Sequence, residues 1–89
     1  MDHPNRSVFE MLNNLYLRVQ ERDVNGFAHD RVRILVRDYE AWLHASWDVN
    51  PDRALEVLNE EWTVAIDECH DAGLEDLAAT LVGIRPRDE

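Results

Sequence analysis

The sequence has no lysine, one cysteine, and only three glycines and three prolines among its 89 residues. Cys69 has no partner for an internal disulfide, which is typical of a reducing compartment. No segment approaches the roughly 18 uninterrupted apolar residues of a membrane span, and residues 1–5 lack the basic and apolar regions of a signal peptide. We therefore expect a cytoplasmic protein.

Motifs of common enzymes are missing as well. The sequence has no glycine-rich phosphate loop and no serine within a nucleophile motif. Cys69 falls on the apolar face of a predicted helix, and His70 lies about 100° away around that helix, so it is badly placed to activate the thiol. The other histidines, His3, His29 and His44, are scattered. These observations predict no enzymatic activity and no cofactor.

The net charge of −10 comes from the second half of the chain. Residues 1–26 and 27–49 each carry four acidic residues against three arginines, whereas residues 50–89 carry eleven against three. An acidic surface of this kind repels nucleic acid and anionic membranes and attracts basic proteins. We expect a partner protein with a basic surface, no direct contact with nucleic acid and no membrane binding.

Apolar residues recur at helical spacing, and the alternation typical of strands appears nowhere. The pattern predicts a first helix from a capping box at Ser7 and Glu10 to about Gly26, and a second over residues 28–47. A third should begin at Asn50-Pro51-Asp52 and end at Gly73, and a short fourth should cover residues 74–82 and stop at Gly83.

The short connections make sequential helices neighbours in space. The expected fold is all-α: a single helical domain over residues 1–89, built as a small antiparallel bundle of three longer helices plus a short C-terminal fourth helix. Residues 1–6 and 85–89 should be short flexible ends. Trp42 and Trp62 should lie in the core, because aromatic residues at helical spacing most often serve packing.

Acidic residues gather on one face of the third predicted helix. Glu56, Glu60, Asp67 and Asp71 fall in one sector opposite the core, and Glu61 and Glu68 lie at its boundary. Several form like-charged pairs at i, i+4, each of which costs a helix a few tenths of a kcal/mol. Asp71 is also close to the negative end of the helix dipole. Local conflicts of this kind are most frequent at functional sites.

We expect this face to dock on an arginine- or lysine-rich surface of another protein. Carboxylates four residues apart rise by about 6 Å, close to the spacing of every second phosphate along a DNA strand. Val57 and Val64 border the acids and could supply an apolar centre, or pack under the fourth helix instead. The predicted partner-binding residues are Glu56, Glu60, Glu61, Val64, Asp67, Glu68 and Asp71.

In size, charge and helicity, though not in any motif, the chain resembles small acidic inhibitors of phages and mobile elements. These include DNA mimics, anti-CRISPR proteins and nuclease immunity proteins. The resemblance implies an inhibitor or adaptor that occupies a basic surface, such as one that normally holds nucleic acid.

Two other interpretations of the charge and the apolar stripes remain open. The acidic face can equally be an ordinary solvated surface, neutralised in part by Arg33, Arg37 or Arg53. A self-associating structural protein is a further alternative. Its dimer face would combine exposed apolar residues of the first and second helices, namely Leu17, Val24, Ile34, Ala41 and Ala45.

A carboxylate-bound metal enzyme is the last alternative. Glu60-Glu61 followed by Glu68-x-x-Asp71 resembles the acidic pairs of all-α nucleotide pyrophosphohydrolases. No acid stands at position 63 or 64 to complete the first pair, and all candidates lie on one helix, whereas such metals are held between facing helices. Asp67-x-x-His70 has ligand spacing, but nothing elsewhere completes four ligands. We therefore expect no metal.

Overall fold

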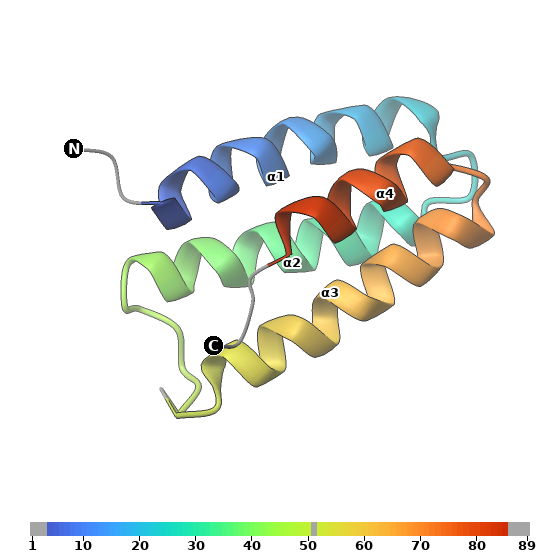
Figure 1. The fold of residues 1–89 in the computed structure, drawn as a ribbon. Coiled ribbons are helices and arrows are strands. Elements are labelled where there is room, and N and C mark those ends of the chain that lie inside the picture. The colour runs from blue at the N-terminus through green and yellow to red at the C-terminus, as the bar shows by residue number, and fades with distance from the viewer. Residues whose placement is uncertain (1–3, 51, 86–89) are drawn as a thin grey trace.

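The computed structural model describes residues 4–50 and 52–85. These residues form four α-helices and no strand: α1 (Pro4–Arg22), α2 (Phe27–Leu43), α3 (Ala54–Asp71) and α4 (Glu75–Ile84). Each helix runs back along the one before it (Figure 1). The first three helices have 19, 17 and 18 residues and α4 has 10, so the predicted all-α bundle of three longer helices and a short fourth is confirmed. None of the described helices is both long and apolar enough to cross a membrane.

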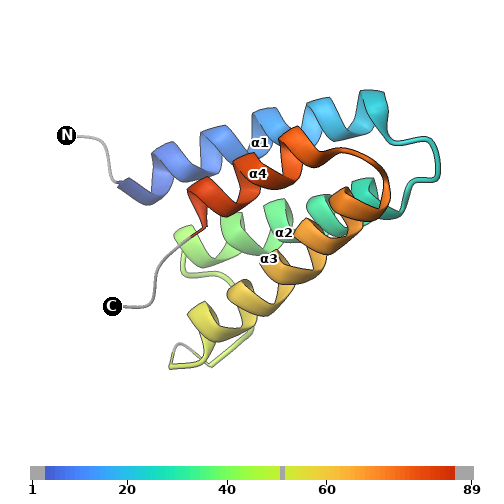
Figure 2. The same cartoon turned by 45° about the vertical axis from the view of Figure 1, so that its right-hand side comes forward.

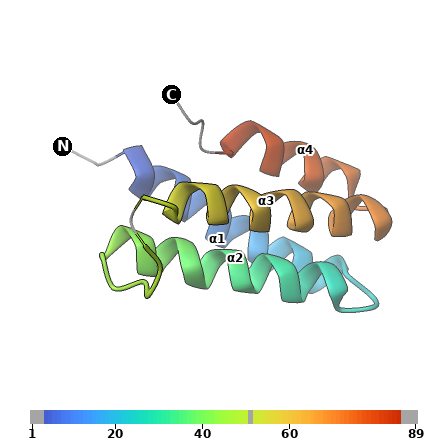
Figure 3. The same cartoon turned by 90° about the horizontal axis from the view of Figure 1, so that it is seen from below.

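The helices contact one another in a closed order. Helix α2 packs on α1 and α3, and α4 packs on α3 and returns to α1. Figure 2 shows α4 running beside α1, and Figure 3 shows α3 between α2 and α4. The remaining side of α3 is left to solvent, and this side carries the acidic residues.

The inner faces of all four helices share one apolar core around Trp62. This side chain is fully buried, and its Nε1 donates a hydrogen bond to the Leu81 carbonyl at 2.8 Å. The prediction that Trp62 lies in the core is confirmed, whereas Trp42 is half-buried and packs edge-on against Tyr39 at 5.4 Å. The other core residues are Leu12, Leu15, Val19, Ala28, Val32, Leu35, Tyr39, Leu58, Ala65, Ile66, Cys69, Leu74, Leu77, Ala78 and Leu81.

The predicted start of α1 is wrong. The helix begins at Pro4, one turn before Ser7 and Glu10, so both residues of the predicted capping box lie inside it. A proline fits the first helical position because its missing N–H would have no partner there. Of the ends predicted to be flexible, residues 4–6 form the first turn of α1, while residues 1–3 and 86–89 lie outside the described part of the chain.

The end of α1 also differs from its prediction. The helix stops at Arg22, and Gly26, with φ of +83°, precedes α2 as its N-cap. Asp23 explains the early stop, because its Oδ2 accepts the backbone N–H of His29 at 2.9 Å and so holds the turn into α2. The glycine therefore begins the second helix and does not end the first.

Helix α2 ends at Leu43, four residues before its predicted end. Ala45 has φ of +54°, a left-handed conformation that stops a helix, and the Ser46 N–H donates to the Ala41 carbonyl at 2.9 Å. The sequence offers no glycine here, so the alanine takes the position that glycine usually fills. Trp47 is consequently part of the connection to α3, where it packs on the core from outside.

Helix α3 begins at Ala54, later than predicted. The Asn50 side chain accepts the Asp52 N–H at 3.0 Å and the Asn50 carbonyl accepts the Arg53 N–H at 2.9 Å, so Asn50 organises a turn before the helix. Pro51, the predicted first helical residue, lies outside the described residues.

The predicted end of α3 is confirmed. Gly73 has φ of +79°, the Leu74 N–H donates to the Cys69 carbonyl and the Gly73 N–H to the His70 carbonyl, as in a Schellman motif.

Helix α4 continues through Gly83 to Ile84, so the predicted stop at Gly83 is wrong. Arg85 is extended, with φ of −61° and ψ of 130°. Because the residue before a proline is disfavoured in helical conformation, Pro86 in the sequence explains this end.

Candidate functional site

The acidic residues of α3 lie on its solvent side, as the helical spacing predicts. Glu56, Glu60, Asp67 and Asp71 are exposed, and Glu61 and Glu68 are half-buried at the boundary. We call these six residues the α3 acidic face. The opposite side of α3 contributes Leu58, Trp62 and Ala65 to the core, so packing sets the direction in which the carboxylates point.

Arginines of the chain neutralise little of this face. Of the arginines that could serve as internal counter-ions, Arg53 alone pairs with it in the described part of the chain, through Nε at 3.6 Å from Glu56 Oε2. Arg33 lies 3.9 Å from Asp30, and Arg37 lies 3.2 Å from Asp38, both within α2. Both side chains of the Arg53–Glu56 pair are exposed, so water screens the attraction between them.

Four carboxylates of the α3 acidic face have no arginine partner among residues 4–50 and 52–85: Glu60, Asp67, Glu68 and Asp71. The alternative of an ordinary solvated surface, neutralised in part by Arg33, Arg37 or Arg53, stays open, and of these three arginines only Arg53 pairs with the face among the described residues.

One end of the acidic face opens into a hollow against α2. Glu60, Glu61 and Val64 of α3 line it together with Arg31 and Ile34 of α2, and it encloses about 250 Å³. Val64 is 39% exposed here and lies on the side of α3 that turns toward α2. The hollow thus places two apolar side chains beside an exposed carboxylate and an arginine.

Glu61, which lines this hollow, interacts with a second carboxyl group that the sequence pattern does not reveal. Asp38 of α2 is 7% exposed, and it is the one charged residue buried within the described chain. Glu61 of α3 interacts with it, and Glu61 Oε2 is closed off from solvent and has no hydrogen-bond partner. Asp38 follows Leu35 by three residues, which places it on the inner side of α2. This spacing is the one sequence feature that indicates a buried aspartate here.

This environment changes the charge of Glu61. Burial, with a further contribution from the Asp38 carboxyl, raises the pKa of Glu61 to about 8, although Arg37 opposes the shift. At neutral pH Glu61 is therefore mainly protonated. Of the predicted partner-binding residues, Glu61 contributes a hydrogen-bonding group more than a negative charge.

The α3 acidic face presents no preformed metal site. Among the described residues, no three histidine, cysteine, aspartate or glutamate side chains converge as metal ligands would. Asp67 and His70 are both exposed, and His70 Nδ1 lies 3.8 Å from Glu75 Oε1. The ligand spacing noted in the sequence therefore brings no further ligands with it.

Two further reactive side chains, Cys69 and His29, are engaged in packing. Cys69 is fully buried, and burial raises the pKa of its thiol to about 11, which makes it unreactive. His29 stacks on Tyr16 with ring centroids 5.0 Å apart and shares a hydrogen bond of 3.1 Å with its hydroxyl, so it ties α2 to α1.

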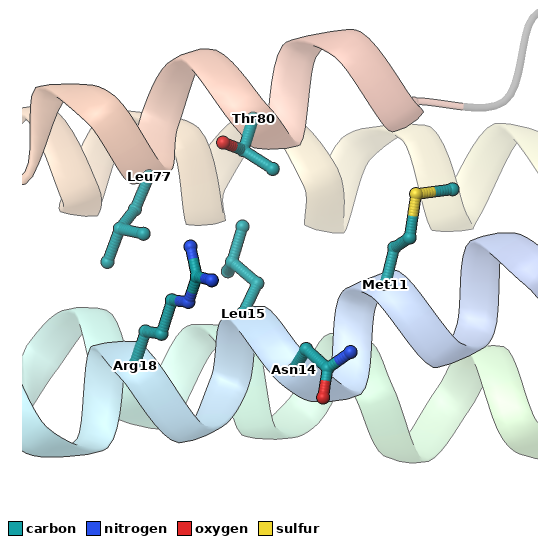
Figure 4. Close-up of a pocket in the computed structure, with 6 residues that line it drawn as sticks. All are labelled: Met11, Asn14, Leu15, Arg18, Leu77 and Thr80. Atoms are coloured by element: carbon teal, nitrogen blue, oxygen red, sulfur yellow. The ribbon is translucent and has the colours of Figure 1, made fainter.

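A second hollow, of about 190 Å³, lies between α1 and α4. Its lining residues are Met11, Asn14, Leu15, Arg18, Leu77 and Thr80. Figure 4 shows the Arg18 side chain rising from α1 toward α4 beside Leu15 and Leu77. This lining contains no carboxylate, imidazole or thiol.

The residues of the alternative dimer face are spread over different surroundings. Leu17 and Val24 are 52% and 95% exposed, and Ala45 is exposed at the end of α2. Ile34 lines the hollow beside Glu60 and Glu61, and Ala41 is half-buried. Ile34 therefore belongs to the same surface as the acidic residues.

No family model matches the chain, and no curated protein and no solved structure matches it. Its likeness to small acidic inhibitors accordingly rests on size, charge and helicity. The chemistry of the exposed residues is what remains to indicate a function.

Proposed function

We propose that this protein is a cytoplasmic binding protein without enzymatic activity, and that its α3 acidic face docks on an arginine- or lysine-rich surface of a partner protein. One observation carries the proposal: Glu60, Asp67, Glu68 and Asp71 have no arginine partner in the described chain. A row of like charges opposes helix stability, so its presence is most simply explained by an external cation.

The hollow beside the face supports the same use. Ile34 and Val64 form an apolar surface on which the aliphatic part of a partner's arginine or lysine can lie, while Glu60 at the edge accepts its charged end. Arg31 of α2 lines the same hollow, and its positive charge repels a cation from the α2 side of the hollow. An apolar centre with charged surroundings is the usual composition of an effective interface.

The charges act at two ranges. The field of the acidic face steers a basic partner during approach and accelerates association, and it is weakened by salt. At contact, pairs such as Asp67 and Asp71 stand about 6 Å apart along the helix, which suits basic side chains that bind alternate phosphates. We therefore propose that the partner surface is one that normally holds nucleic acid, and that the protein acts as an inhibitor or adaptor there, as DNA mimics do.

Affinity capture with matched variants tests the proposal. The first variant neutralises the unpaired carboxylates of α3, and the second neutralises the same number of exposed acids elsewhere. The first carries Glu60→Gln, Asp67→Asn, Glu68→Gln and Asp71→Asn, and the second carries Glu10→Gln, Glu21→Gln, Glu40→Gln and Asp48→Asn. Both therefore have the same net charge, and circular dichroism checks that both remain helical.

Capture of a partner from host extract should be lost in the first variant and kept in the second, and it should weaken steeply as salt is raised. Unchanged capture by the first variant would remove the α3 acidic face from the interface. Equal loss in both variants would show that net charge, and not this face, attracts the partner. Self-association through Leu17 and Val24 would instead persist at high salt.

A further inference from the structure

We propose that Asp38 and Glu61 share one proton across the contact between α2 and α3, and that loss of this proton weakens the packing of α3 on α2. The two carboxyl groups come from different helices and meet where those helices pack together. The inference concerns the fold itself and does not require that the α3 acidic face bind a partner.

The geometry leaves no good arrangement for two ionised carboxylates. Asp38 is 7% exposed, and Glu61 Oε2 has neither solvent nor a hydrogen-bond donor. A charged oxygen in that position would lose its hydration without compensation, and it would also be repelled by its neighbour. One proton between the two groups removes a charge and supplies a strong hydrogen bond.

The charged groups on α2 decide which carboxyl holds the proton. Arg37 Nε lies 3.2 Å from Asp38 Oδ1, so the guanidinium pairs with the Asp38 carboxyl. Arg31 and the exposed Glu60 of α3 line the same hollow as Glu61. The proton therefore resides mainly on Glu61.

The charged groups of α4, the other helix packed on α3, lie elsewhere. Asp76 pairs with Arg22 of α1 at 2.6 Å, and Glu75 lies 3.8 Å from His70. His70 is nine residues, or about 13 Å, further along α3 than Glu61. Helix α1 makes its contacts with α2 and α4. Asp38, Arg37, Arg31 and Glu60 are thus the charged groups that surround Glu61.

The direction of the pH effect follows from the raised pKa of Glu61, from 4.5 to about 8. Burial is the largest cause, followed by the interaction with Asp38. The unfolded chain releases this proton above pH 4.5, whereas the folded chain keeps it until about pH 8. The stability that the pair contributes is therefore fully present below pH 4.5 and is lost as pH rises through about 8.

Urea unfolding of the full chain between about pH 5.5 and 8.5 tests the inference. The midpoint of the wild type should fall by roughly 0.5 to 1.5 M over this range. Glu61→Gln should show a much smaller fall, because the amide keeps a donor toward Asp38 and cannot ionise. Glu60→Gln, a change at the exposed neighbour, should keep the full fall.

The pH range and the comparison isolate Glu61 from other groups. Burial raises the pKa of Cys69 from 9.0 to about 11 and that of Tyr39 from 10.0 to about 12, so their effects on stability begin mainly above the range. Histidines are common to all three proteins and cancel in the difference between them. A wild-type midpoint that does not fall, or an equal fall in Glu61→Gln, would overturn the inference.

Carboxyl carbon NMR of the wild type gives a test that needs no stable variant. The Glu61 side-chain carboxyl should titrate above pH 7, and Asp38→Asn should lower its pKa. If Glu61 titrates below about pH 5 in the wild type, no proton is shared with Asp38 and the inference fails.

Discussion

Replacement of Trp62 by phenylalanine removes a buried hydrogen bond through which α3 holds the last turn of α4. The indole Nε1 donates to the Leu81 carbonyl at 2.8 Å from a fully buried position. In a longer helix this carbonyl would accept the N–H of Arg85, but that N–H donates to Val82 instead, at 3.4 Å. Trp62→Phe therefore leaves the Leu81 carbonyl without its donor.

Two losses add up in this variant. A buried carbonyl left without a hydrogen bond costs about 1 to 2 kcal/mol. The smaller ring also leaves space beside Tyr39, whose ring packs edge-on against Trp62 at 5.9 Å, and such a cavity costs about 1 to 2 kcal/mol more. We expect a total of about 2 to 4 kcal/mol, a large share of the roughly 4 to 13 kcal/mol typical of a chain this long.

Urea denaturation followed by circular dichroism measures this loss. Trp47→Phe is the matched control, because the same chemical change is made at a half-buried residue in the connection between α2 and α3. It should cost less than about 1 kcal/mol. If Trp62→Phe costs no more than Trp47→Phe, the hydrogen bond to Leu81 does not hold α4 as described.

Two further predictions concern the ends of α3 and α4. Gly73→Ala should lower the free energy of unfolding by about 1 kcal/mol, because φ is +79° at this residue. Gly83→Ala should raise it by about 0.5 to 1 kcal/mol, because Gly83 lies inside α4 with open space around it. Melting temperatures that shift in the same direction in both variants would contradict this. Arg85→Ala removes hydrogen bonds to Asn59 Oδ1, the Asn59 carbonyl and Thr63 Oγ1, of 2.9, 2.8 and 2.6 Å. It should cost about 1 to 2 kcal/mol and raise amide exchange in α4 alone, so equal acceleration in all helices would argue against it.

The number of helices, their class and their inward faces were predictable because helical periodicity is a local property of the sequence. Leu58, Trp62 and Cys69 are buried where their spacing placed them, and Gly73 ends α3 through its own conformational freedom. The exposure of Glu60 and Asp67 follows from the same periodicity. Each of these features depends on residues within a few turns of one another.

The helix ends were less predictable because competing local signals decide them. Ser7 and Glu10 matched a capping box, yet Pro4 starts α1 earlier. Gly83 looked like a stop, but an exposed glycine is tolerated within a helix, and Pro86 ends α4 instead.

Contacts between helices belong to the tertiary structure alone. The charge pattern of α3 could be read directly from the order of its residues, and so could its separation from the apolar side. The position of α3 along and around α2 decides which carboxylate Arg37 contacts. It also decides whether Glu61 meets Asp38. A displacement of one residue rotates a side chain by about 100°, so only the packed bundle determines which carboxylates remain charged and which one holds a proton.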